Sequence, residues 1–79
     1  MVARMDLREI FAFNLRRLRN ERGLTQDDLA YEAGVNRGYL SQLETARYYA
    51  SLKILGRLAE VLSVEPAELL RMPDGHSSP

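Results

Sequence analysis

Five positions between residues 37 and 45 combine polar or very small side chains with the spacing of one helix face. These positions are Arg37, Gly38, Ser41, Gln42 and Thr45. A guanidinium can donate two parallel hydrogen bonds to the O6 and N7 atoms of guanine, and a glutamine amide can pair in the same way with adenine. A serine or threonine hydroxyl reaches a base edge or a phosphate, whereas glycine offers no side-chain donor. We therefore interpret the five positions as base contacts in a DNA major groove.

Two short helices must hold this polar face, and the sequence carries start and stop signals for both. Thr25 is a favourable N-cap for a helix over residues 26–33. Gly34 follows, where glycine can adopt the left-handed conformation that ends a helix. Asn36 then caps a second helix over residues 37–46, the recognition helix. The short break between them predicts a compact helix-turn-helix.

Small and apolar residues fall where the two helices have to touch. Ala30 allows close approach of the backbones, and Val35 fills the corner between them. Leu40 and Leu43 recur at i, i+3 on the inner side of the recognition helix. The polar positions of that helix are consequently expected to face away from the core.

Several residues of this stretch match the helix-turn-helix of the Cro and phage-repressor (XRE) family. The matching residues are Gln26, Ala30, Gly34, Leu40 and the run SQLE at residues 41–44. The resemblance extends more loosely over residues 15–70, and the runs DLAY and RGYLSQLE are most similar to the controller proteins of restriction–modification systems. It implies an all-α, compact five-helix domain of the lambda-repressor type, with its helix-turn-helix at about residues 25–46.

The resemblance also implies roles for individual residues. In the family, the positions of Arg37, Gly38 and Gln42 read bases. Gly38 departs from the pattern because it has no side chain, so the base step beside it would be read through DNA shape or left unread. An arginine at the position of Arg19 pairs with the glutamate at the position of Glu44 and braces the first helix against the recognition helix. We expect this bridge, the alternative being a solvated arginine on an arginine-rich face.

Phosphate contacts are expected around the base-reading face. They are assigned to Gln26, Asn36, Tyr39, Arg47, Arg16 and Lys53. Gln26 matches the family position that bonds a phosphate at a helix N-terminus, where free amides favour anions. For Arg16 and Lys53, as for Arg17, ordinary solvated charge is the alternative, and the ring of Tyr39 could equally pack on the core. Such contacts set affinity and register, while base contacts set sequence preference.

The loop that follows the recognition helix reads TARYYAS and departs from the family pattern. Ala46 stands where glycine is common, and Ala50 stands where proline is common. The usual contacts from the loop backbone to phosphates are therefore not implied. Arg47 is the better candidate for a phosphate contact, whereas Tyr48 and Tyr49 could contact phosphates or pack over the edge of the core.

A longer helix precedes the pair. Asp6 and Glu9 have the spacing of a capping box, and Gly23 ends a helix that runs to about Arg22. Its apolar positions are Leu7, Ile10, Phe11, Leu15 and Leu18. This stripe predicts an amphipathic helix.

Two further helices are expected after the loop. Ser51 caps one over residues 52–62, and Pro66 starts the other within PAELLRM. The inward-facing positions of the first are Leu52, Leu55, Leu58, Ala59 and Leu62. Ile54 and Val61 widen its apolar arc to about half the circumference, more than the roughly 100° that one buried face needs. The last helix or a second protomer could cover the excess. The expected dimer interface comprises Ile54, Leu58, Val61 and Leu69.

The composition limits the class of protein. A chain of 79 residues forms one domain, buries only about 60% of its unfolded surface, and has no cysteine for disulfides or thiolate metal sites. Eleven basic residues balance eleven acidic ones, which argues against indiscriminate DNA binding but not against a specific binder with segregated charges. No apolar run is long enough for a membrane span or signal peptide, so a cytoplasmic protein is expected.

The expected layout is a flexible leader over residues 1–5, a single helix-turn-helix domain over residues 6–72 and a disordered tail over residues 73–79. The single histidine, His76, falls in this tail. No nucleophile, glycine-rich phosphate loop or metal-ligand cluster accompanies the acidic residues. We therefore expect no enzyme activity, no cofactor, no metal and no small-molecule ligand.

Two functions fit these expectations. The first is a transcription regulator that binds double-stranded DNA as a homodimer, because one short helix reads too few base pairs to find one genomic site. Its two recognition helices would lie about 34 Å apart on a palindromic operator. The family suggests autoregulation, and an activating role would bring RNA polymerase to an acidic patch of Asp27, Asp28 and Glu32. The second is a protein-interaction module, such as an antitoxin or adaptor, which the zero net charge and Gly38 favour. The polar outer face favours DNA.

Overall fold

The computed structural model describes residues 6–73, which fold into four α-helices and one short 3-10 helix. The helices are α1 (Leu7–Glu21), α2 (Gln26–Ala33), α3 (Arg37–Glu44), α4 (Leu52–Leu62) and the 3-10 helix η1 (Pro66–Leu70). No strand occurs in this range, so the all-α class is confirmed. The expected leader, and residues 74–79 of the expected tail with His76, lie outside the described residues.

The expectation of a fifth α-helix is wrong. η1 is a 3-10 helix of five residues, and no side chain caps its N-terminus. Pro66 supplies the fixed φ of a first helical position but has no N–H to donate. The chain is extended again at Arg71. A segment this short makes only the tighter i→i+3 bonds of a 3-10 helix.

α1 begins and ends where the sequence predicts. The carboxylate of Asp6 accepts a hydrogen bond from the N–H of Arg8 at 2.7 Å, and Glu9 accepts one from the N–H of Asp6 at 3.1 Å. Both halves of the capping box are therefore present. Past the helix end, Gly23 has a φ of 69° in the left-handed region.

The helix-turn-helix also has its predicted caps. The hydroxyl of Thr25 accepts from the N–H of Asp28 at 3.0 Å, and the carboxylate of Asp28 accepts from the N–H of Thr25 at 3.1 Å. Gly34 ends α2 with a φ of 71°, and Asn36 caps α3. α3 ends two residues before its predicted end at residue 46, because Ala46 has a φ of 62° and turns the chain out of the helix.

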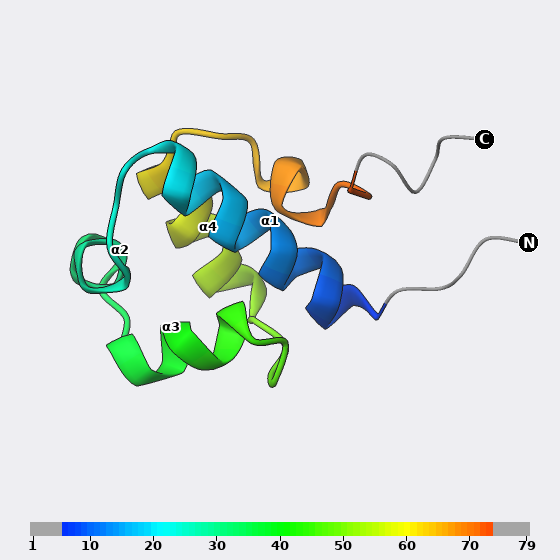
Figure 1. Ribbon diagram of the computed structural model, residues 1–79, viewed down its shortest axis with the longest axis horizontal. Coiled ribbons are helices and arrows are strands. Elements are labelled where there is room, and N and C mark those ends of the chain that lie inside the picture. The colour runs from blue at the N-terminus through cyan, green and yellow to red at the C-terminus, as the bar shows by residue number, and fades with distance from the viewer. Residues whose placement is uncertain (1–5, 74–79) are drawn as a thin grey trace, which may run out of the picture.

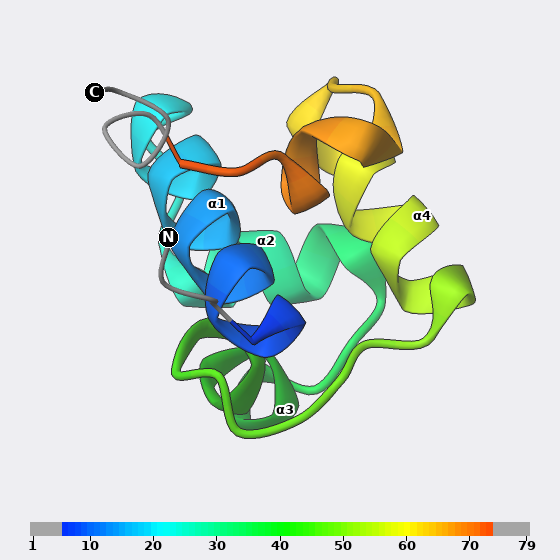
Figure 2. The same cartoon turned by 90° about the vertical axis from the view of Figure 1, so that its right-hand side faces the viewer.

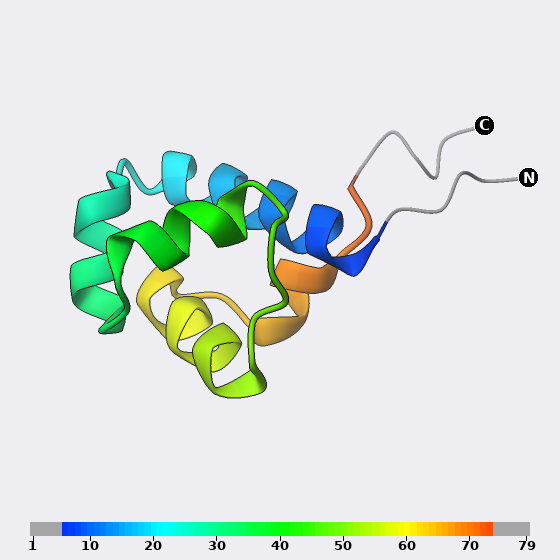
Figure 3. The ribbon, with the colours of Figure 1, turned by 90° about the horizontal axis from the view of Figure 1, so that it is seen from below.

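The helices enclose one core and leave α3 at its edge. α1 packs against α3 and η1, and α2 packs against α3 and α4. The leucines without exposed surface are Leu15, Leu29, Leu40, Leu43, Leu58, Leu62 and Leu69. Figure 1 shows α3 along the lower edge with no helix beneath it, and in Figure 2 it again lies lowest, below α1 and α2. From below, α3 lies in front of α1 (Figure 3). One side of α3 is therefore open to solvent.

One leucine expected inside is exposed, and two leucines expected at a dimer interface are buried, one of which, Leu58, was also predicted to face inward. Leu52, expected to face inward, is 84% exposed, because it is the first residue of α4 and precedes the stripe that reaches the core. Leu58 and Leu69, expected at a dimer interface, have 0% exposure and belong to the hydrophobic core. Leu58 lies on the inward stripe of α4, and the tight turn of η1 directs Leu69 inward. Neither side chain is available to a partner.

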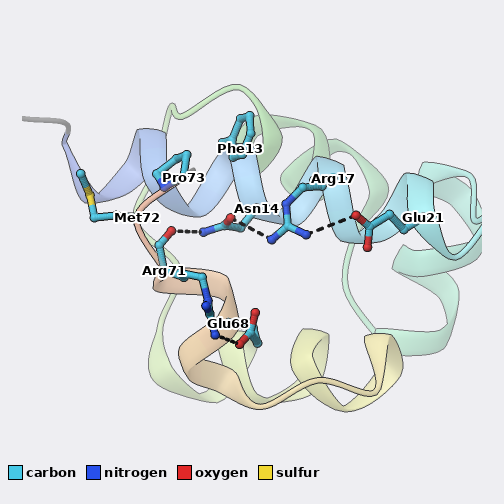
Figure 4. A pocket seen from close by; sticks show the side chains of 8 residues that line it. All are labelled: Phe13, Asn14, Arg17, Glu21, Glu68, Arg71, Met72 and Pro73. Carbon is cyan, nitrogen blue, oxygen red and sulfur yellow. Dashed lines mark hydrogen bonds and ion pairs between the residues drawn. The ribbon is translucent and has the colours of Figure 1, made fainter. Parts of the chain in front are cut away.

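Asn14 is a buried polar residue that the sequence interpretation missed. Its Nδ2 donates to the carbonyl oxygens of Leu69 at 3.1 Å and Arg71 at 2.8 Å. Its Oδ1 accepts from Arg17 at 3.2 Å, and Arg17 also pairs with Glu21 at 3.3 Å (Figure 4). The amide therefore ties the end of η1 to α1, and Arg17 holds the amide in place.

Candidate nucleic-acid interface

The open side of α3 carries the residues that were predicted to contact bases. Arg37, Gly38, Gln42 and Thr45 are exposed, and Ser41 is half-buried. All belong to one helix or its C-cap, while the opposite side of that helix buries Leu40 and Leu43. The polar residues therefore lie on a helix at the edge of the molecule (Figure 1).

Gly38 has a local structural role at the start of α3. Its N–H donates to Oδ1 of Asn36 at 2.7 Å, and the N–H of Tyr39 donates to the same oxygen at 3.2 Å. A Cβ on Gly38 would lie 3.0 Å from that oxygen, closer than an ordinary contact. Glycine therefore lets the capping amide sit close to the backbone. A phosphate oxygen accepts hydrogen bonds, so a side-chain contact from Asn36 would come from its Nδ2, which the cap does not use.

Arg37 forms an ion pair across the turn that the sequence interpretation missed. Its Nε lies 3.0 Å from Oδ1 of Asp27 in the first turn of α2. Both side chains stay open to solvent, with 64% exposure for Arg37 and 75% for Asp27. Asp27 is the only partner of this guanidinium within residues 6–73, and its carboxylate lies nearest to Nε. The two terminal nitrogens of Arg37 are therefore open for a ligand.

The predicted bridge between Arg19 and Glu44 is confirmed. Nε and Nη2 of Arg19 donate to the two carboxylate oxygens of Glu44 at 2.7 and 3.0 Å. The side chain of Glu44 is 2% exposed and that of Arg19 is 14% exposed. Nη1 of Arg19 also donates to the carbonyl of Leu24 at 2.8 Å. Since Glu44 is the last residue of α3, this two-pronged bridge fixes the C-terminal end of the recognition helix against α1.

Two residues predicted to contact phosphates turn toward the same glutamate. Nε2 of Gln26 donates to Oε1 of Glu44 at 3.0 Å. Nη1 of Arg16 donates to the main-chain carbonyl of Glu44. These bonds hold the end of α3 from two further directions. Phosphate contacts of Gln26 and Arg16 are consequently limited to the N–H groups that remain.

The C-terminal end of α3 leads into the loop that was expected to approach phosphates. The hydroxyl of Thr45 donates back to the carbonyls of Ser41 and Gln42, at 3.1 and 3.2 Å, so it is engaged within the helix. The side chain of Arg47 is exposed, and its N–H donates to the carbonyl of Gln42 at 2.9 Å. Tyr39 is half-buried against the core, so its ring packs there, as the alternative to a phosphate contact had it.

The two loop tyrosines are exposed and lie near the start of α1. The guanidinium of Arg8 lies over the ring of Tyr49, 5.0 Å from its centroid. The same guanidinium donates to the carboxylate of Asp6 at 3.0 and 2.9 Å. These bonds lower the pKa of Asp6 to about 2. Lys53, the remaining phosphate candidate, is exposed on the first turn of α4.

Other kinds of site find no support in the part of the chain that the structure describes. Between residues 6 and 73, no three histidine, cysteine, aspartate or glutamate side chains gather as a metal site would require. None of the helices in this range has both the length and the apolar character of a membrane span.

Comparisons with known proteins agree with this architecture. Residues 10–72 match a family model described as a helix-turn-helix domain. An uncharacterized HTH-type transcriptional regulator of Sinorhizobium fredii, y4dJ, is 39% identical over 70 residues, which cover 89% of this chain and 91% of the relative.

Solved structures show the same likeness. The hypothetical transcription factor NHTF from Neisseria has a TM-score of 0.84 at 32% identity, covering 92% of this chain and 85% of that chain. The restriction–modification controller protein C.AhdI from Aeromonas hydrophila has a TM-score of 0.76 at 37% identity, covering 78% and 94%. The resemblance to repressor-like and controller proteins is confirmed.

Proposed function

Because the chain belongs to the helix-turn-helix family of transcriptional regulators, we propose that it is a sequence-specific DNA-binding regulator. The family is one of DNA-binding proteins rather than enzymes. The observation that best supports the proposal is the outer face of α3. This face is polar and open, and the buried carboxylate of Glu44 holds its C-terminal end in place.

The dimensions of α3 fit a major groove. A helix with its side chains is about 10–12 Å wide, and the major groove of B-DNA is about 12 Å wide. Arg37 and Gln42 are five residues apart and so lie roughly 7.5 Å apart along the helix axis. That distance spans about two base-pair steps of 3.4 Å. Arg37 would read a guanine through O6 and N7. Gln42 would read a base about two steps away, and adenine is the best partner for a glutamine amide.

Affinity would come from a small number of phosphate contacts. Arg47 and Lys53 are exposed and form no ion pair within residues 6–73. Each phosphate that is neutralised contributes about −0.9 to the slope of log affinity against log salt. With a formal net charge of zero, the chain would bind unrelated DNA weakly and depend on base contacts for its choice of site.

A two-fold operator requires a second copy, and one face of the molecule is suited to receive it. Five apolar or aromatic side chains are exposed around a single groove, and we name them the Leu52 face: Leu7, Tyr48, Tyr49, Leu52 and Leu70. This surface replaces the interface expected from the sequence, since Leu58 and Leu69 are buried and Ile54 and Val61 are half-buried against the core.

The Leu52 face is mostly apolar, and its groove is large enough to receive a side chain. Its groove has a volume of about 160 Å³, similar to the roughly 150 Å³ that holds a benzene molecule in a protein interior, and Leu52 projects beside it. In a two-fold pair, Leu52 of each copy enters the groove of the other. At the rim, Asp6 and Arg8 neutralise each other at 2.9 Å. An uncharged apolar partner therefore fits this surface better than nucleic acid does.

Sedimentation tests the dimer separately from DNA binding. Leu52→Asp is expected to halve the sedimenting mass at micromolar concentration while leaving the far-UV circular dichroism spectrum unchanged, because the side chain is exposed. Tyr31→Asp is the matched control, since Tyr31 is 88% exposed on α2 and outside the Leu52 face. A Leu52→Asp protein that stays dimeric would refute this interface, and a monomeric wild type would refute the dimer.

Selection of bound duplexes from a random pool tests the function itself. The wild type is expected to enrich a two-fold symmetric motif that contains guanine, and Arg37→Ala is expected to relax the choice at that guanine. Arg71→Ala, an exposed arginine on the far end of η1, is the control and is expected to select the wild-type motif. Weak, salt-sensitive binding without enrichment would contradict the proposal. Occurrence of the motif at the chain's own promoter would support autoregulation.

The alternative is a protein-interaction module with the same fold, such as an antitoxin or adaptor. The outer side of α2 is the surface that such a role, or contact with RNA polymerase by an activator, would use. It exposes Tyr31 between Asp28 and Glu32. If duplex selection fails, this side of α2 is the place to look for a protein partner.

A further inference from the structure

The ion pair between Asp27 and Arg37 joins the two helices of the motif at their N-terminal ends. Asp27 lies in the first turn of α2, and Arg37 is the first residue of α3. The Nε of Arg37 lies 3.0 Å from Oδ1 of Asp27. An arginine at a helix start has many rotamers, and an opposite charge beside it favours those that keep the guanidinium close to that charge.

Asp27 is not needed for the cap of α2. The neighbouring Asp28 closes the capping box with Thr25, through bonds of 3.0 and 3.1 Å. Asp27 is 75% exposed, and Arg37 is its single partner among the described residues. The fold therefore leaves the Asp27 carboxylate free to act on Arg37 alone.

The geometry of the pair is compatible with base reading. A guanidinium has five N–H donors, one on Nε and two on each terminal nitrogen. Oδ1 of Asp27 lies 3.0 Å from Nε, and neither terminal nitrogen of Arg37 has a partner within residues 6–73. End-on pairing with the O6 and N7 atoms of guanine needs those two nitrogens and not Nε.

We infer that Asp27 is a positioning residue that sets the sequence preference of Arg37. The inference rests on the proposed DNA-binding function and adds a residue from outside the recognition helix to the specificity of that site. The charge of Asp27 keeps the guanidinium near the N-terminal end of α2, where its terminal nitrogens meet a guanine end-on. Its own carboxylate touches no base in this arrangement.

The carboxylate has a second effect of opposite sign. A negative charge next to the recognition helix repels DNA phosphates and weakens binding to every sequence. Removing the charge should therefore tighten binding in general while reducing the advantage of the guanine-containing site. A residue that acted only through its charge would change both duplexes by the same factor.

Asp27→Asn separates these effects, with Glu32→Gln as the matched control. Glu32 is an exposed carboxylate on the same helix and forms no ion pair within residues 6–73. The readout is the dissociation constant for a duplex in which the guanine opposite Arg37 is replaced, divided by the dissociation constant for the selected duplex. Exposed ion pairs contribute modestly, so Asp27→Asn should lower this ratio roughly two- to fivefold. Glu32→Gln should leave the ratio unchanged.

The same pair of variants in an Arg37→Ala background completes a double-mutant cycle. If Asp27 acts through Arg37, Asp27→Asn has no effect on the ratio in that background. If Asp27→Asn changes the ratio by the same factor in the Arg37→Ala background as in the wild type, Asp27 contacts a base itself. That result would overturn the inference. An unchanged ratio in the wild-type background would overturn it too, while leaving the DNA-binding function intact. Absence of any selected motif for the wild type would overturn both.

Discussion

Replacing Arg19 by methionine should destabilise the fold severely, because it leaves the buried carboxylate of Glu44 without its cation. In the wild type, Arg19 donates two of the three side-chain hydrogen bonds to that carboxylate, at 2.7 and 3.0 Å, and Gln26 donates the third at 3.0 Å. Arg19→Met keeps a long apolar chain in place but removes both charged bonds. Gln26 alone would then face a charge that is 2% exposed.

The magnitude follows from two independent considerations. Hydrogen bonds to charged groups contribute about 1.5–3 kcal/mol each, so the loss of two gives roughly 3–6 kcal/mol. Breaking a buried ion pair by removing one partner costs about 3–5 kcal/mol. We therefore expect Arg19→Met to lower the free energy of unfolding by about 3–5 kcal/mol, a large part of the roughly 4–12 kcal/mol typical of a domain this size.

The double variant Arg19→Met/Glu44→Met provides the control. It removes the buried charge together with its partner, so its loss should be no more than about 1–2 kcal/mol, smaller than that of Arg19→Met alone. Urea titration by circular dichroism at low temperature, where small domains are near maximum stability, measures both. A loss below about 1 kcal/mol for Arg19→Met, or a double variant as unstable as the single one, would refute the reasoning.

Four further substitutions test the backbone and capping arguments. Ala46→Gly should raise the free energy of unfolding by about 0.5–1 kcal/mol, because φ at this position is 62°, in the left-handed region that favours glycine. Ala50→Gly in the same loop is the control and should lower the free energy of unfolding. The urea midpoints of the two variants should therefore shift in opposite directions. Gly56→Ala should raise the free energy of unfolding by up to about 1 kcal/mol, since the added Cβ on α4 meets no atom within 4 Å; an unchanged or lower midpoint would contradict this. Hydrogen bonds from Arg8 lower the pKa of Asp6 to about 2 in the folded chain, from an ordinary 3.8. The ionised Asp6 therefore stabilises the fold above about pH 4, and this stabilisation is lost as the pH falls toward 2. Thermal midpoints over that range should therefore fall less steeply for Asp6→Ala than for the wild type, and equal slopes would contradict this.

Local signals predicted the helices and their caps well. Asp6, Thr25, Asn36 and Ser51 each cap the helix that they were expected to start, and Gly34 ends α2 in the left-handed conformation. These features depend on a few neighbouring residues, whose hydrogen bonds do not need the rest of the fold. The bridge between α1 and α3 is long-range, and family resemblance rather than local pattern predicted it.

Features that depend on tertiary contacts were predicted less well. The apolar stripe of α4 indicates which side faces inward but not where the neighbouring helices stop, so Leu52 at its first turn was placed in the core although no element covers it. The 3-10 geometry of η1, which buries Leu69, could not be read from an apolar pattern of five residues. Asn14 falls between Phe11 and Leu18 on the stripe of α1, and this position was the available signal that its amide is buried.

The candidate site shows the same division. Composition and helical spacing placed Arg37 and Gln42 on the open side of α3, where the structure has them. Neither the inward bond of Gln26 nor the pair between Asp27 and Arg37 follows from spacing, because each joins residues on different helices. Binding experiments on defined duplexes test the proposed contacts of these side chains with DNA.

The most direct of these experiments substitutes 7-deazaguanine for the guanine assigned to Arg37 in the selected duplex. The change removes the N7 acceptor from the major groove and leaves Watson–Crick pairing intact. If the terminal nitrogens of Arg37 read O6 and N7, the wild type should bind this duplex about tenfold more weakly, whereas Arg37→Ala should bind both duplexes equally. Equal binding of both duplexes by the wild type, or an equal loss for Arg37→Ala, would contradict the placement of α3 in the major groove with Arg37 on that base.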